Sequence, residues 1–116
     1  MKFEEMHLGT QVGMSLERYA NFHDLELREC GVGSFQEKSG RDAHRAWCIK
    51  SKTDVIYYIY LQVAYAKDNK TGFKISKVSS IILYDFKTFN TLVKTHLNSV
   101  VDMKDFYTQI ERFLLS

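Results

Sequence analysis

The chain has 116 residues, of which 45% are hydrophobic, 14% aromatic and 26% charged. This composition predicts one compact α+β domain over residues 1–116 that buries its core without disulfide or metal staples. No stretch approaches the roughly 18 apolar residues of a membrane span, and residues 1–5 lack the apolar region of a secretory signal, so we expect a cytoplasmic protein with no membrane segment.

The charge is distributed unevenly, although the net charge is only +2. Residues 1–37 carry three basic and seven acidic side chains, whereas residues 38–77 carry nine basic and three acidic ones. The N-terminal third is therefore acidic and the middle is basic. Such an asymmetry can orient the encounter with a charged partner, but it does not identify that partner.

The N-terminal segment predicts a helix that begins at Ser15, a residue type favoured as an N-cap. The residues after it place four side chains on one helical face: Leu16, Tyr19, Ala20 and His23. Gly9 and Gly13 would each cost a helix interior about 1 kcal/mol relative to alanine. We therefore expect these glycines to interrupt the helical pattern of the first two dozen residues, so that the helix restarts at Ser15.

Four strands are predicted after this helix, each bounded by glycine or polar turn residues, over residues 25–30, 43–51, 55–65 and 73–84. In the second of them, Trp47 and Ile49 are expected to point inward. The turn over residues 67–72 is the clearest hairpin, because it is rich in Asp, Asn and Gly. Connections this short favour antiparallel neighbours, and hence a meander.

The third strand, 55–65, is the most strongly determined stretch of the chain because β-branched and aromatic residues fill it. Alternation predicts a core face made of Val55, Tyr57, Ile59, Leu61, Val63 and Tyr65. The opposite, mixed face is made of Ile56, Tyr58, Tyr60, Gln62 and Ala64. In the fourth strand the apolar residues change parity near Ser76 and Lys77, which predicts a β-bulge there.

Two helices are predicted at the C-terminus. Asp85 is the expected N-cap of the first, whose apolar stripe is Phe86, Phe89, Leu92 or Val93, Leu97 and Val100. Asp102 is the expected N-cap of the second, whose stripe is Met103, Phe106, Tyr107, Ile110, Phe113 and Leu114. The predicted fold is α+β: a four-stranded antiparallel meander with an N-terminal helix and two C-terminal helices packed on one face.

Motifs for catalysis and for cofactor binding are weak. The four histidines do not stand at the spacing of a helical zinc site, and Cys30 and Cys48 have no Cys or His neighbour at ligand spacing. Gly31 and Gly33 match two glycines of a dinucleotide fingerprint, but Gln36 stands in the third position. We therefore expect no catalytic residue, metal or cofactor, although a site assembled from distant residues stays open.

The basic hairpin over residues 50–77 is the one candidate site. Its predicted partner-binding residues combine flat rings with cations: Tyr58, Tyr60, Lys50, Lys52, Lys70 and Lys74. If the strand face that carries the tyrosines is uncovered, it suits a protein partner or stacking on nucleobases. In the other interpretation a helix covers the tyrosines, and the lysines only protect a sheet edge.

The first functional hypothesis is a small non-catalytic protein-binding module, of the inhibitor or immunity type, that occludes a toxin or an enzyme. The alternative is a nucleic-acid-binding protein that uses the same basic, tyrosine-bearing hairpin. Low net charge and the acidic N-terminal third count against the alternative. Monomer and homodimer are both compatible with the sequence.

Overall fold

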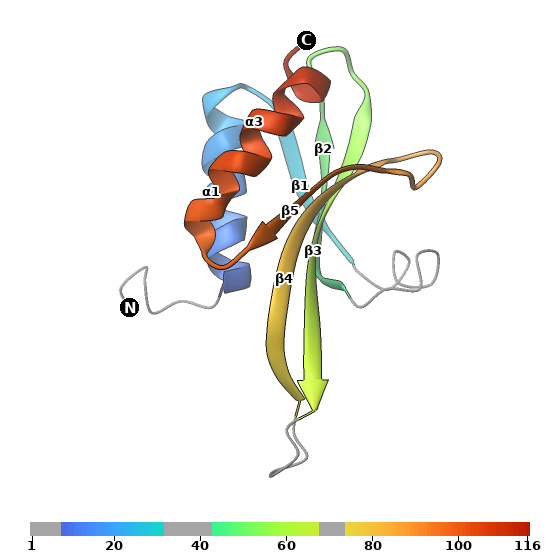
Figure 1. The fold of residues 1–116 in the computed structure, drawn as a ribbon. Coiled ribbons are helices and arrows are strands. Elements are labelled where there is room, and N and C mark those ends of the chain that lie inside the picture. The colour runs from blue at the N-terminus through green and yellow to red at the C-terminus, as the bar shows by residue number, and fades with distance from the viewer. Residues whose placement is uncertain (1–7, 32–42, 68–73) are drawn as a thin grey trace.

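The computed structural model describes residues 8–31, 43–67 and 74–116, and for residues 43–44, 63–67 and 74–78 it describes the backbone alone. The described chain forms a five-stranded antiparallel sheet in the order β1-β2-β3-β4-β5, with two α-helices (Figure 1). The elements are α1 (Leu8–Phe22), β1 (Glu26–Cys30), β2 (Ala43–Lys50), β3 (Ile56–Lys67), β4 (Lys74–Asp85), β5 (Thr91–Leu97), the 3₁₀ turn η2 (Val100–Asp102) and α3 (Met103–Leu114).

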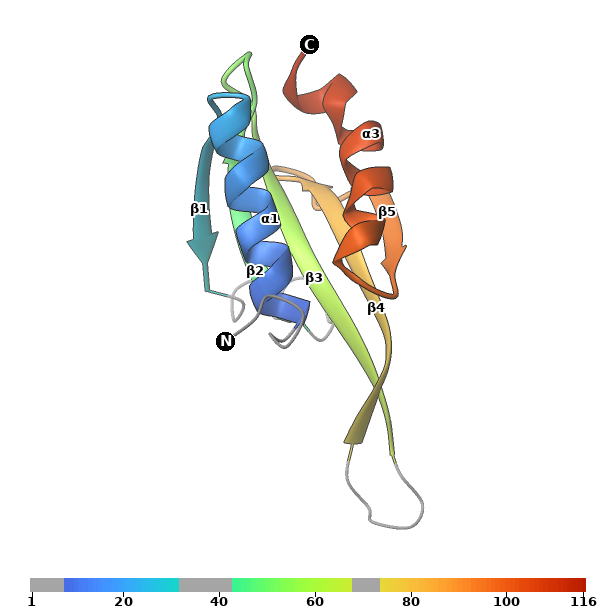
Figure 2. The same ribbon diagram turned by 90° about the vertical axis from the view of Figure 1, so that its left-hand side faces the viewer.

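The α+β class and the antiparallel meander are confirmed, but the predicted counts of four strands and three helices are wrong: the described residues form a sheet of five strands and two α-helices. Both helices lie on one face of the sheet, as expected (Figure 2). No helix in the described parts of the chain is long and apolar enough to cross a membrane.

The main core lies between the helices and this face of the sheet. Apolar residues of α1 and α3 meet alternate residues of β2, β3, β4 and β5 there, among them Leu16, Phe106, Ile110, Trp47, Ile59, Leu61, Ile81, Leu83 and Val93. The inward direction predicted for Trp47 and Ile49 is confirmed. Val55 was expected in this core but is 45% exposed, because it belongs to the turn before β3, where its N–H donates to Ser51 Oγ.

The β-bulge predicted near Ser76 and Lys77 is confirmed. Ala64 of β3 pairs with Val78, whereas the next residue, Tyr65, pairs with Ser76. Lys77 is therefore the extra residue that reverses the parity of β4. The turn predicted over residues 67–72 falls mostly outside the described residues, although the pairing of Lys67 with Lys74 shows where it begins and ends.

The helix predicted to follow Asp85 does not form, and β5 takes its place. Asp85 Oδ1 does accept hydrogen bonds from the N–H groups of Lys87 and Thr88, as an N-cap would, at 2.8 and 3.1 Å. The chain then reverses at Phe89, whose φ of 59° lies in the left-handed region, and pairs back along β4. In this chain, local capping therefore starts a hairpin instead of a helix.

The stripe predicted for the last helix is confirmed in α3, where Met103, Phe106, Ile110 and Leu114 are buried. Asp102 stands at the N-cap position, but its side chain serves the preceding turn: Oδ2 accepts from the N–H groups of Asn98 and Ser99 at 2.7 and 3.2 Å. The aspartate therefore fixes the turn that brings α3 back over the sheet.

The start of α1 corrects the prediction of a helix beginning at Ser15. The helix already runs through Gly9 and Gly13, which lie one turn apart on the face toward β2. The Arg45 guanidinium lies on these glycines: Nη1 donates to the Gly9 carbonyl at 2.7 Å, and a Cβ added at Gly13 would lie 3.0 Å from Nη1. The glycines cost helix propensity, but they let an arginine fit between helix and sheet.

Ser15 is in the interior of α1, where its hydroxyl contacts the Tyr107 hydroxyl of α3 at 2.5 Å. One turn further on, the Tyr19 ring stacks on the Tyr107 ring, with centroids 4.3 Å apart and an interplanar angle of 3°. Burial raises the pKa of each of these tyrosines to about 12, and the Glu111 carboxylate adds to the rise at Tyr19. This stack joins the two helices above the core.

We expect Gly13→Ala to have opposite consequences with and without Arg45. In an Arg45→Ala background the new methyl group has room, so that Gly13→Ala should stabilise the fold by about 1 kcal/mol through helix propensity. In the native chain the methyl group meets the guanidinium, and the gain should shrink by at least about 0.5 kcal/mol or reverse. Urea unfolding of the four proteins measures this coupling, and equal effects in both backgrounds would contradict it.

The tyrosine stack predicts an alkaline loss of stability. A tyrosine ionises near pH 10 in the unfolded chain, while the pKa values of Tyr19 and Tyr107 are raised to about 12 in the fold. The unfolded state therefore releases protons first, so that the stabilisation is complete below pH 10 and falls between pH 10 and about 12. The free energy of unfolding measured by urea across this range should fall less steeply for Tyr19→Phe. An unchanged slope would rule out this origin.

Candidate functional site

The face of the sheet opposite the helices, which we call the outer face, has a buried centre. Ala46, Tyr60 and Ile82 lie side by side on three neighbouring strands, and each is fully buried. Tyr84 is adjacent and only 2% exposed. Tyr58 and Phe89 pack against this group from the side, so that the sheet has a second, smaller apolar cluster.

Aromatic and apolar side chains, two of them exposed and two half-buried, form one border of this cluster, which we call the aromatic rim: Ile56, Tyr58, Phe86 and Phe89. The Tyr58 ring stacks on Phe86 and Phe89, with centroids 5.0 and 5.7 Å apart. Phe86 is 40% exposed and Ile56 41% exposed, whereas Tyr58 is half-buried. The hairpin turn between β4 and β5 holds both phenylalanines in place, because Asp85 and the left-handed Phe89 determine its path.

Two cysteines lie next to Tyr58 on the outer face. Cys48 is directly across from Tyr58 on β2, and Cys30 lies on β1. Burial raises the pKa of the Cys30 thiol to about 11, and Cys48 beside it contributes to the rise. Burial and these two sulfurs also raise the pKa of Tyr58. The Cys30 thiol is therefore neutral at physiological pH, which makes it apolar surface more than a nucleophile.

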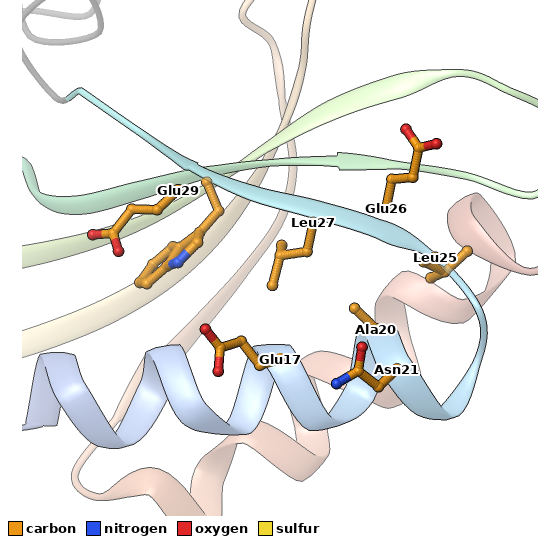
Figure 3. Close-up of a pocket in the computed structure, with 8 residues that line it drawn as sticks. Glu17, Ala20, Asn21, Leu25, Glu26, Leu27 and Glu29 are labelled. Carbon is orange, nitrogen blue, oxygen red and sulfur yellow. The ribbon is translucent and has the colours of Figure 1, made fainter.

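A cleft of about 480 Å³ lies between α1 and β1 on the helix side of the sheet (Figure 3). Its lining includes Glu17, Ala20 and Asn21 from α1, Leu27 and Glu29 from β1, and Trp47 from β2. Glu17 extends from the helix toward the strand and Leu27 extends from the strand toward the helix, whereas Glu26 points to the other side of β1. The cleft thus combines carboxylates with apolar walls.

The corner between α1 and β1 determines the shape of this cleft. Asp24 has φ of 56°, and the N–H groups of Asp24 and Leu25 donate to the carbonyls of Asn21 and Ala20 at 3.4 and 2.8 Å. This is a Schellman ending with aspartate in the position that glycine usually takes. It turns the chain back at once, so that β1 runs beside the helix that precedes it.

Arg45 lies at one end of the cleft and pairs with Glu29. Nε and Nη2 of Arg45 donate to the two carboxylate oxygens of Glu29 at 2.7 and 2.5 Å. These hydrogen bonds lower the pKa of Glu29, and they raise the pKa of Arg45. Glu29 is therefore ionised and paired, and the Glu17 carboxylate, which also attracts Arg45, adds a second negative charge to the cleft.

A second hollow, of about 520 Å³, lies on the outer side of β1. Its lining includes Arg28 of β1, Cys48 and Lys50 of β2, and Ile56 of β3. Lys50 Nζ is 3.7 Å from the Asp54 carboxylate, and both side chains are exposed. The strand β1 is thus bordered by a hollow on each side. Glu17 and Glu29 line the hollow on the helix side, whereas Glu26, Arg28 and Lys50 line the outer one.

The structure separates the sequence-predicted residues into two groups. Lys50 is opposite Ile56 at one end of β3, while Lys74 is opposite Lys67 at the other, so that roughly 36 Å of strand divides them at about 3.3 Å per residue. Lys52 is exposed in the turn between β2 and β3, where its N–H donates to Leu114. Lys70 lies outside the described residues, and the side chain of Lys74 is not described.

The two predicted tyrosines have different surroundings. Tyr58 lies in the aromatic rim, whereas Tyr60 is fully buried at the centre of the outer-face cluster. The structure thus brings Tyr58 and Lys50 to the same end of the outer face, with Lys52 in the adjoining turn. It also adds residues that the sequence did not indicate as a site: Phe86 and Phe89, which had been assigned to a helix, and Glu17 and Trp47, which only the folded corner brings together.

Within residues 8–31, 43–67 and 74–116, no three or more His, Cys, Asp or Glu side chains gather in a way that could hold a metal ion.

The raised pKa predicts slow alkylation of Cys30. At pH 8 a thiol with a pKa of about 11 has roughly 100-fold less thiolate than one with a pKa of 9, and its higher intrinsic nucleophilicity recovers about tenfold of this. Iodoacetamide should therefore modify Cys30 about tenfold more slowly than the same cysteine in a peptide copy of residues 27–31. Peptide mapping by mass spectrometry measures both rates, and equal rates would contradict the burial argument.

The chain was also compared with known proteins. No family model matches it, and neither a curated protein nor a solved structure gives a match. Functional inference therefore depends on the geometry of the outer face and of the β1 edge.

Proposed function

We propose that this chain is a small, non-catalytic protein-binding module, of the inhibitor or immunity type, that occludes a toxin or an enzyme. The observation that carries the proposal is the aromatic rim. Its Phe86 and Ile56 are about two-fifths exposed, and Tyr58 lies between them on a rigid strand. Aromatic side chains on a rigid scaffold, with polar groups around them, are typical of the centre of a protein interface.

The charged groups near the rim support this proposal. Arg28 and Lys50 border the outer hollow beside Ile56 and Cys48, and Lys52 is exposed in the next turn. Glu26 and Asp54 lie beside these cations, so that the apolar centre has a charged border of mixed sign, as the rim of a protein interface has. The stacking of Tyr58 on Phe86 and Phe89 orders the rings before binding, which lowers the entropic cost of an interface.

The nucleic-acid alternative needs lysines and tyrosines on one continuous surface. Tyr60 is buried, and Lys50 is at the opposite end of β3 from Lys74. Among the candidates whose side chains the structure describes, Tyr58, Lys50 and Lys52 remain near one another. The protein-binding proposal uses these three residues together with Phe86 and Ile56, and we therefore favour it.

We expect Phe86→Asp to abolish capture of the partner. Purified chain on beads would be exposed to lysate of the source cells, and proteins retained in stoichiometric amounts would be identified by mass spectrometry. Loss of a central aromatic contact costs about 2 kcal/mol or more, so that retention should fall at least about 30-fold. Val101→Asp is the matched control, since Val101 is 63% exposed and lies in η2, away from the rim.

Circular dichroism would verify that both variants fold. Equal retention by Phe86→Asp and the native chain would contradict the proposal. So would a complex with a random single-stranded oligonucleotide that forms at low salt and dissolves at high salt, because that is the behaviour of a nucleic-acid-binding protein.

A further inference from the structure

The outer edge of β1 is open in the described structure. β1 is the terminal strand of the sheet, and among the described strands only β2 pairs with it. In Figure 2 it lies at the border of the sheet, beside α1. Every second residue of such a strand directs its N–H and C=O groups away from the sheet, where an added strand can pair with them. Glu26, Arg28 and Glu29 are exposed along this edge.

Each face of this edge has a hollow that β1 itself helps to line. The cleft of about 480 Å³ is on the helix side and the hollow of about 520 Å³ is on the outer side. Side chains of a strand alternate between its two faces. A strand added at β1 would therefore direct one alternate set of side chains toward the cleft and the other set toward the outer hollow.

The charges of the two hollows specify what each set of side chains should be. On the helix side the Glu17 carboxylate faces β1, near the apolar surfaces of Leu27 and Trp47, and Glu29 is already paired with Arg45. A lysine or arginine suits this side, since its aliphatic stem can lie on apolar surface while its charge reaches a carboxylate. On the outer side, Glu26, Arg28 and Lys50 make the charge mixed, so that an apolar side chain, which can lie against Ile56, suits this side.

We propose that the β1 edge binds an extended segment of a protein partner by strand addition, with alternate basic side chains in the cleft between α1 and β1. This inference rests on the proposed function, because it takes the partner to be a protein, and it adds the segment and its sequence pattern. Backbone hydrogen bonds would supply affinity and the cleft would supply specificity. A second copy of the chain fits less well, because pairing two β1 edges would bring two acidic clefts to the same seam.

The probe is a capped seven-residue peptide in which lysine alternates with valine. Its controls are a peptide with glutamate in place of each lysine, and a peptide of the same composition with the alternation removed. Trp47 is the single tryptophan and lines the cleft, so that its fluorescence reports on binding there. We expect the alternating lysine peptide to bind at least about tenfold more tightly than either control, a difference of about 1.4 kcal/mol. Amide exchange should slow in residues 26–30 and stay unchanged in β5.

Charge reversal tests the role of the cleft. Glu17→Lys should weaken binding of the lysine peptide about tenfold and strengthen binding of the glutamate peptide. Glu111→Lys is the matched control: Glu111 is an exposed helical glutamate of α3 outside the cleft, and its reversal should change affinity less than about twofold.

Three results would overturn the inference: equal binding of all three peptides, protection of β5 instead of β1, or a homodimer that the lysine peptide fails to dissociate. Failure of the proposed function is distinguishable from these results. If a partner is captured through Phe86 but is retained equally by Glu17→Lys, the inference of strand addition is wrong and the proposed protein-binding function is supported. If the lysine peptide binds as described while Phe86→Asp retains the same proteins as the native chain, the proposed aromatic-rim interface is wrong and strand addition at β1 is supported.

Discussion

The Arg45 guanidinium determines how α1 lies against the edge of the sheet. It fills the space that Gly9 and Gly13 leave on the helix, and it binds the Gly9 carbonyl and both oxygens of Glu29. A larger residue on the helix would displace it, and a shorter one on β2 would leave a gap where these hydrogen bonds are made. The planar Arg45 guanidinium, with its several N–H donors, thus joins α1, β2 and the edge strand β1. This contact fixes the first half of α1 against the sheet, next to Glu29, which lines the cleft beside β1.

The stretches with one clear periodicity were predictable, and those with two competing ones were not. Side-chain alternation predicted β3, and an apolar helical stripe predicted α3. A change of parity in β4 predicted the bulge at Lys77. β5 was missed because Leu92 and Val93 are both apolar and Asp85 resembles an N-cap. Tyr84 pairs with Thr91 while Leu83 pairs with Val93, so that Leu92 is a bulge residue, and this bulge hides the alternation of Val93 and Leu97. Gly9 and Gly13 lower the helix propensity of α1, but the contact that offsets this cost comes from Arg45 on β2, which is distant in the sequence.

The candidate site shows the same division. Tyr58 and Lys50 could be proposed from the sequence, because strand alternation places them on the outer face. The burial of Tyr60 could not, since it depends on Ala46 and Ile82 in the neighbouring strands. Nor could the cleft, which needs the abrupt corner at Asp24 to bring Glu17 opposite Leu27. Charge patterning along the chain indicated an acidic region and a basic one, but the folded sheet decides which charges share a surface.

The bulge at Lys77 has a consequence for how this chain can change length during evolution. Between the bulge and Asp85, β4 alternates strictly, with Ile81 and Leu83 in the main core and Ile82 and Tyr84 in the outer cluster. Inserting or deleting one residue there would move each apolar set to the opposite face of the sheet. The resulting loss of core packing would exceed the small stability of a domain of this size. Between the bulge and the hairpin end of β4, the strand pairing already accommodates one extra residue. Gaining or losing another residue there leaves the two apolar clusters in place. We therefore expect length variation among descendants of this sequence to concentrate in the arm formed by the ends of β3 and β4.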